Sequence, residues 1–452
     1  MALVSLVSLA ILAYQAHAGQ FTQRTFPRRL AIQASLPAWV PWAAKAGDKP
    51  PTTNEVVQTV GGMQQLRLGS SEVLVSQLGL GTQRWGSADF NAPDEALCHR
   101  FLDMATSSGI TTLDTAESYP IPSDARLGKG EGTTEEIIGR WLAKGGKGRR
   151  EKLVVATKIT GGSNVNRRNI IAAVDGSCQR LQTDYIDSYL LHWPARYTPQ
   201  SNWGQSLAYD RSAENQPYYK NFAKFDEIAQ TMGELVLQGK IRSYGMCNDN
   251  AVGLCLTAAA AERLGVPGPT VMQNDFSLID RRAEENGVSE ASSPLHLNAG
   301  FLAYNTLAGG YLTGKYLEEP AAVDVVGSRY AKAPRGRHDD YSWGRTLYRY
   351  RSGPAEAATR AYKRLADRYG ISLTELSLRW CKSRPLVTSS LVGFTSVAQF
   401  EESLRAFQKP ALPAELLWEI DRVHMRNRLP IFCSDRVGKD WDGEGEIGER
   451  IP

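Results

Sequence analysis

Four residues in the first half of the chain have side chains that could act together on a carbonyl group. Asp114, Lys158 and His192 each follow a short apolar run, and Tyr119 lies in the loop beyond Asp114. In carbonyl reduction, hydride reaches carbon while oxygen must receive a proton. Tyr119 would donate that proton, and Lys158 would lower the pKa of the phenol from its usual value of about 10. Asp114 would hold Lys158, and His192 would hydrogen-bond the oxygen as it gains charge.

Taken singly, each of these residues has a structural explanation. An aspartate after a strand often caps a helix, a loop tyrosine often packs, and a histidine in an apolar segment often belongs to the core. Here they follow three successive predicted strands, and strand ends in a parallel barrel face the active site. The sequence therefore predicts that they meet at one rim.

The elements that must position these side chains follow an alternating pattern. From about residue 63, short β-branched runs alternate with amphipathic helical stretches, which is typical of a parallel sheet. We predict eight strands, at residues 75–80, 111–114, 153–157, 186–191, 241–246, 270–273, 301–304 and 389–392. Eight strand–helix units favour an α/β fold, the (β/α)8 TIM barrel.

Three further segments complete the predicted barrel. Residues 63–68 and 73–75 predict an N-terminal β-hairpin that covers the bottom of the barrel. The connections at residues 193–219 and 316–353, after strands 4 and 7, are long and should overhang the top.

Three blocks resemble the catalytic blocks of the aldo-keto reductase superfamily, in the same order. They are Asp114-Thr115-Ala116-Glu117 with Tyr119, Ala156-Thr157-Lys158, and Leu191-His192-Trp193-Pro194. The resemblance extends over residues 63–428 and is to the bacterial, plant and algal reductases close to potassium-channel β-subunits. It implies NADPH-dependent reduction of an aldehyde or ketone to an alcohol, with Tyr119 as general acid.

The same resemblance implies a cofactor site. Cys247-Asn248 stands where the family has a Ser-Asn pair that binds the nicotinamide amide, and residues 307–315 resemble the pyrophosphate loop. Arg329 would hold the 2′-phosphate of NADPH. The implied contacts are Gly81, Thr82, Asn248, Gln273, Tyr304, Leu307, Gly309, Leu312, Gly314, Lys315, Arg329, Gly393, Thr395, Gln399, Glu402 and Ser403. Trp85, Trp193 and Trp203 are the expected substrate contacts.

Two other nucleotide-binding patterns fail at single positions. Residues 309–315 fit G-x-x-x-x-G-K, but Tyr316 stands where a P-loop needs Ser or Thr for magnesium. In the glycine-rich stretch at residues 128–132, Thr133 stands where a dinucleotide fingerprint needs its third glycine. The sequence thus argues against a P-loop enzyme and a Rossmann dehydrogenase.

Composition restricts the partners. The net charge is only +4 over 452 residues, and Lys and Arg are scattered, which argues against nucleic acid and favours a small-molecule carbonyl substrate. Six cysteines form no C-x-x-C pair and no H-E-x-x-H occurs, so we expect no metal.

The N-terminus predicts a targeting leader at residues 1–47, ahead of a barrel at residues 60–432 and a flexible tail at residues 433–452. No acidic residue precedes Asp48, and an apolar run is followed by Ala16-His17-Ala18, which resembles a signal-peptidase site. We expect a signal peptide of about residues 1–18 and a transit segment after it, with delivery to a plastid by the secretory route. The alternative is secretion or the endomembrane lumen, and no stable membrane insertion of the mature chain is expected in either case.

Two functional classes therefore remain open. The first is the carbonyl reductase. The second is a cofactor-binding regulatory module resembling potassium-channel β-subunits, because Leu391-Val392-Gly393-Phe394-Thr395 with Gln399 resembles their last helix.

Overall fold

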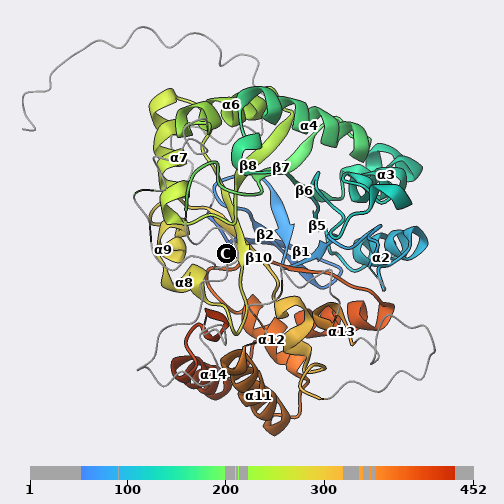
Figure 1. Ribbon diagram of the computed structural model, residues 1–452, viewed down its shortest axis with the longest axis vertical. Coiled ribbons are helices and arrows are strands. Elements are labelled where there is room, and N and C mark those ends of the chain that lie inside the picture. The colour runs from blue at the N-terminus through green and yellow to red at the C-terminus, as the bar shows by residue number, and fades with distance from the viewer. Residues whose placement is uncertain are drawn as a thin grey trace, which may run out of the picture. The chain divides into compact units, whose positions relative to one another are not determined.

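The structure, a computed structural model, describes residues 52–89, 91–198, 209, 212, 222–318, 335–339, 347, 350 and 352–432 (Figure 1). The predicted leader at residues 1–47 and the tail at residues 433–452 lie outside these residues. Trp203 and Arg329 also lie outside them, and so does most of both predicted long loops.

Eight parallel strands close into a barrel in the order β10-β11-β4-β5-β6-β7-β8-β9, with helices around it (Figure 1). This confirms the (β/α)8 prediction. The strands are β4 (Leu78–Gly81), β5 (Thr112–Asp114), β6 (Val154–Ile159), β7 (Ile186–Leu191), β8 (Ile241–Cys247), β9 (Val271–Asp275), β10 (Gly300–Tyr304) and β11 (Ser389–Val392).

The predicted hairpin is confirmed as part of an antiparallel sheet of three strands, β1 (Val56–Val60), β2 (Met63–Arg67) and β3 (Leu74–Ser76). β1 was not predicted. Its five side chains are all exposed, so its sequence lacks the alternation that marks a half-buried strand.

The predicted first barrel strand, residues 75–80, is wrong as a single element. It comprises the end of β3 and most of β4, because the chain leaves the hairpin sheet at Ser76 and enters the barrel at Leu78. The Ser76 hydroxyl donates to the Leu78 carbonyl at 2.6 Å, which stabilises the change of direction. Ser76 and Gln77 separate the apolar residues of the two strands, and the predicted range joined both sides of this polar pair.

The helices outside the barrel begin where the sequence provides caps. Asp94, Asn166 and Ser396 each accept a hydrogen bond from a backbone N–H in the first turn of the helix that follows. The helices are α2 (Glu95–Ser107), α3 (Thr133–Arg150, broken at Gly146), α4 (Arg167–Leu181), α6 (Phe225–Leu237), α7 (Ala251–Leu264), α8 (Arg282–Glu285), α9 (Val288–Ser292), α11 (Gly353–Arg368), α12 (Leu373–Lys382), α13 (Val397–Gln408) and α14 (Ala414–Arg426).

The core has an inner and an outer part. Inside the barrel, Leu68 and Val75 of the hairpin region pack with Leu190, Val271 and Leu302. Larger clusters fill the space between strands and helices. Complete burial of one such aliphatic side chain stabilises the fold by about 1.5–3 kcal/mol. The bottom is thus closed by packed side chains, and the top is left for a site.

Within the described ranges, no helix combines the length and apolar character needed to cross a membrane.

Candidate active site

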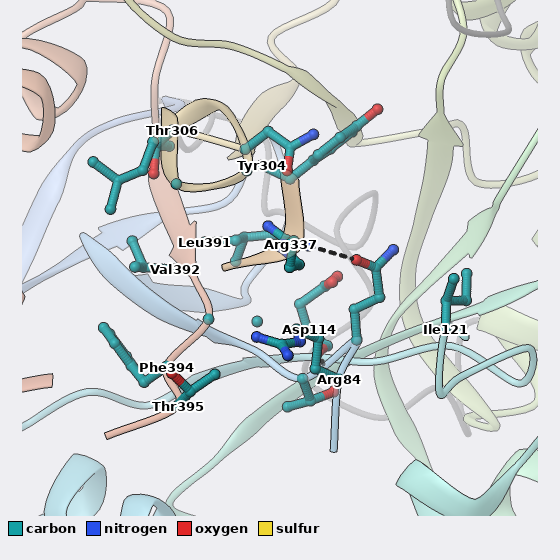
Figure 2. A pocket seen from close by; sticks show the side chains of 18 of the residues that line it. Arg84, Asp114, Ile121, Tyr304, Thr306, Arg337, Leu391, Val392, Phe394 and Thr395 are labelled. Atoms are coloured by element: carbon teal, nitrogen blue, oxygen red, sulfur yellow. Dashed lines mark hydrogen bonds between the residues drawn. The ribbon is translucent and has the colours of Figure 1, made fainter. Parts of the chain in front are cut away.

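A cavity of about 820 Å³ lies at the ends of the barrel strands. Gly81, Asp114, Cys247, Tyr304 and Val392 each end a strand, and all five line it. Most predicted site residues that the structure describes also line it. They are Gly81, Thr82, Trp85, Asp114, Tyr119, His192, Trp193, Asn248, Gln273, Tyr304, Leu307, Gly309, Lys315, Gly393, Thr395, Gln399, Glu402 and Ser403. Figure 2 shows several of them around the open space.

Lys158 does not itself line the cavity but is paired with Asp114, which does. Its Nζ is 2.7 Å from Asp114 Oδ1 and 2.6 Å from the Thr115 carbonyl oxygen, and its side chain is completely buried. A buried ammonium without a partner would cost several kcal/mol. The structure therefore brings these two residues together as an ion pair, as the sequence predicted.

Tyr119 and His192 complete the cluster. Their rings meet edge to face with centroids 5.7 Å apart, and Lys158 Nζ is 5.3 Å from the centre of the tyrosine ring. The Ser118 hydroxyl is 3.4 Å from His192 Nδ1. Both rings line the cavity, so a small molecule there would contact the phenol and the imidazole together.

The environment keeps Tyr119 protonated and His192 neutral. Burial, followed by the charge of Asp114, raises the pKa of Tyr119 well above 10. The expected net lowering of this pKa is not found in the structure, because burial and the charge of Asp114 raise it. Burial, followed by Lys158, lowers the pKa of His192 well below 6.5.

The predicted amide-binding residues lie beside the ion pair. Gln273 Nε2 donates to Asp114 Oδ1 at 2.7 Å, and the Cys247 thiol donates to Gln273 Oε1 at 3.3 Å. Asn248 Nδ2 donates to the His192 carbonyl at 2.9 Å, and the Tyr304 hydroxyl donates to Asn248 Oδ1. Sequence reasoning grouped these residues without showing their contact with Asp114.

The glycine loop after β10 forms another wall of the cavity. Gly309 has a φ of +65°, and a Cβ there would meet Leu347 Cδ2 at 2.8 Å, so only glycine fits without strain. Two predicted contacts from this loop do not line the cavity. Leu312 is fully buried in the outer core, and Gly314 ends the short helix η5 (Ala308–Thr313). The helical turn directs both away from the open space.

A sequence model described as the Aldo/keto reductase family matches residues 77–424. The chain belongs to the aldo/keto reductase family.

Its relatives agree with this membership. The chain is 34% identical to Protein tas of Escherichia coli (strain K12) over 81% of this chain and 99% of the relative. It is 32% identical to an aldo-keto reductase of Babesia bovis over 62% of this chain and 98% of the relative. It is 30% identical to the uncharacterized oxidoreductase YrpG of Bacillus subtilis (strain 168), over 76% and 91% respectively. The chain is thus an oxidoreductase of the family that uses NAD(P)H.

The cavity of this aldo/keto reductase fits an anionic dinucleotide. Lys315, Arg84 and Arg337 all line it. Burial, then Arg84, lowers the pKa of Arg337 to about 10, and burial, then Arg337 and Arg84, lowers that of Lys315. Such mutual repulsion is relieved when an anion binds between the cations.

Arg84 and Arg337 were missed from the sequence. Arg337 Nη1 donates to Gln83 Oε1 at 3.3 Å across the cavity (Figure 2). Arg84 forms an ion pair with Asp89. Arg337 belongs to a long connection without periodicity, and the available signal was the basic cluster Arg335-Gly336-Arg337 after the glycine loop.

The two described tryptophans differ in this aldo/keto reductase. Trp193 stacks on His192 with centroids 5.7 Å apart, which places a second aromatic ring beside the imidazole in the cavity lining. Trp85 is 1% exposed and stacks on Phe101 in the outer core, so most of its ring packs against core side chains and little of it faces the cavity.

Proposed function

We propose that this aldo/keto reductase reduces an aldehyde or ketone to an alcohol with NADPH, and that Tyr119 is the general acid. One observation supports this most strongly. A protonated phenol, a neutral imidazole and a buried Lys158–Asp114 pair converge at one cavity.

In this mechanism, each side chain has one task. Residues of the cavity lining, including Lys315, Arg84 and Arg337, would hold NADPH, which when bound would supply the hydride for the carbonyl carbon. Tyr119 donates its proton to the carbonyl oxygen, and Lys158 stabilises the phenolate that remains. His192 is neutral and can donate one N–H bond to the same oxygen. Asp114 keeps Lys158 charged and in place, and acid catalysis of this kind contributes about 10²–10⁴-fold in rate.

NADPH is proposed over NADH because of the three cations. The 2′-phosphate adds negative charge to a cofactor that already carries a pyrophosphate, and Lys315, Arg84 and Arg337 offer three positive groups. The predicted 2′-phosphate ligand, Arg329, lies outside the described residues. We assign this role to Arg337, which lines the cavity.

The substrate end of the cavity favours apolar or ring-bearing carbonyls. Trp193 and Ile121 line the same cavity as Tyr119 and His192. An aromatic aldehyde would bury its ring against these side chains and present its carbonyl to the phenol.

The test is oxidation of NADPH by the full chain, followed by loss of absorbance, with 4-nitrobenzaldehyde and 9,10-phenanthrenequinone as substrates. The reductase proposal predicts turnover with formation of the alcohol. If the protein binds NADPH tightly and turns over neither carbonyl, the reductase proposal fails and the regulatory module resembling potassium-channel β-subunits takes its place.

A further inference from the structure

A continuous chain of hydrogen bonds links the predicted amide-binding residues to Asp114. It runs from the Tyr304 hydroxyl to Asn248 Oδ1, and from Asn248 Nδ2 to Cys247 Sγ at 3.4 Å. It continues from the Cys247 thiol to Gln273 Oε1 at 3.3 Å, and from Gln273 Nε2 to Asp114 Oδ1 at 2.7 Å. All five residues line the cavity.

The chemistry of the groups fixes the direction of this chain. An ionised carboxylate only accepts hydrogen bonds, so the amide nitrogen of Gln273 must face Asp114 and its oxygen must face Cys247. The Cys247 thiol is then the donor. Burial raises its pKa to about 12, so it keeps the proton that this role requires.

Asp114 Oδ1 accepts from two donors at once. Lys158 Nζ and Gln273 Nε2 each lie 2.7 Å from it, and they come from β6 and β9. Two donors on one oxygen hold the carboxylate more firmly than the ammonium alone. Asp114 in turn positions Lys158. Fixing Asp114 therefore also fixes the Lys158 ammonium, which lies 5.3 Å from the centre of the Tyr119 ring.

We propose that Gln273 is a positioning residue for proton transfer, which fixes Asp114 and through it Lys158, and that the Cys247 thiol orients the Gln273 amide for this task. The proposal rests on the proposed reduction. It assigns Gln273 an effect on the rate of the chemical step through Asp114 and Lys158, in addition to any effect on cofactor affinity.

The kinetic test compares Gln273→Met with the unchanged chain. We would measure the Kd for NADPH and the single-turnover rate of 4-nitrobenzaldehyde reduction at saturating NADPH. Loss of the amide should slow the single turnover by about 10-fold or more, while any loss of NADPH affinity is smaller. A raised Kd with an unchanged single-turnover rate would overturn the proposal.

Two pairs of variants sharpen this result. Cys247→Ala removes the thiol donor and should slow single turnover, whereas Cys247→Ser retains a donor and should recover most of that loss. Gln65→Met is the matched control, because Gln65 is buried in β2 of the hairpin sheet and does not line the cavity. Its amide donates to the Gly109 carbonyl at 2.8 Å and accepts from the Thr111 hydroxyl. Gln65→Met should cost stability without slowing the chemical step. Equal rates in the two Cys247 variants would remove the thiol from the proposal.

A readout without cofactor separates this inference from the proposed function. In the cofactor-free protein with ¹⁵N-labelled glutamine, the Gln273 side-chain amide should exchange with solvent far more slowly than that of the exposed Gln399. Asp114→Asn should shift the Gln273 signal. If the chain turns over no carbonyl and the Gln273 amide is protected, the proposed function and the role in proton transfer fail, while the positioning of Asp114 by Gln273 stands. If that amide exchanges as fast as Gln399, the positioning inference fails.

Discussion

At the scale of single residues, burial decides how severe a substitution is. Lys158 is fully buried, and Asp114 is its charged partner. Asp114→Ala leaves that ammonium without compensation, so the free energy of unfolding should fall by about 3–5 kcal/mol. Urea denaturation measures this change.

The matched control for Asp114→Ala is Asp367→Ala, which breaks an exposed Lys–Asp pair with Lys363 on α11. Exposed pairs are worth about 0–1 kcal/mol. Similar losses in the two variants would show that Lys158 does not depend on Asp114 for its charge.

Arg337 is expected to decide between the two nicotinamide cofactors. Arg337→Gln removes one of three cations that line the cavity, so the Kd for NADPH should rise about 10-fold or more. The Kd for NADH should change less, because it lacks the 2′-phosphate. Fluorescence titration measures both constants, and an equal loss for the two cofactors would place Arg337 at the pyrophosphate instead.

At the scale of elements, the glycine loop after β10 must keep its left-handed backbone. Gly309→Ala introduces strain at a φ of +65° and also brings Cβ to 2.8 Å from Leu347 and 3.2 Å from His338. We expect a loss of stability above about 1 kcal/mol together with weaker NADPH binding.

Gly370→Ala is the control for this loop, since Gly370 has the same φ of +65° and no atom lies within 4 Å of its added Cβ. It should show the backbone penalty alone and bind NADPH normally. If Gly309→Ala matches it in both measurements, the packing of the loop does not shape the site.

The elements also show what a sequence can and cannot reveal. Short apolar β-branched runs that alternate with amphipathic helical stretches, together with the polar residues at the ends of those runs, were sufficient to predict the barrel and the meeting of Asp114, Lys158 and His192. β1 was missed because it is exposed on both faces, and the β3–β4 break was missed because only Ser76 and Gln77 separate the apolar residues of the two strands. The contact between Gln273 and Asp114 joins β9 to β5 across the barrel, and no local pattern encodes it.

At the scale of the whole molecule, two buried histidines make stability depend on pH. Burial lowers the pKa of both His192 and His424 in the folded protein. In the unfolded chain these groups have ordinary pKa values of about 6.5 and bind protons first as pH falls. The free energy of unfolding should therefore decrease below about pH 6.5, by up to about 1.4 kcal/mol per pH unit for each proton.

Urea midpoints at pH 7.5 and pH 5.5 measure this dependence. His192→Gln should make it shallower, whereas His296→Gln, at an exposed position, should leave it unchanged. Equal stability of the unchanged chain at the two pH values would show that the histidines are protonated alike in both states.

The measurement that tests the central claim most directly is the rate of a single turnover of 4-nitrobenzaldehyde with saturating NADPH, in the unchanged chain and in Tyr119→Phe. The substitution removes one hydroxyl and leaves the lining of the cavity in place. If Tyr119 is the proton donor, NADPH should bind both proteins with similar Kd while the variant reacts about 10²–10⁴-fold more slowly. Equal single-turnover rates in the two proteins would contradict the assignment of Tyr119 as the general acid.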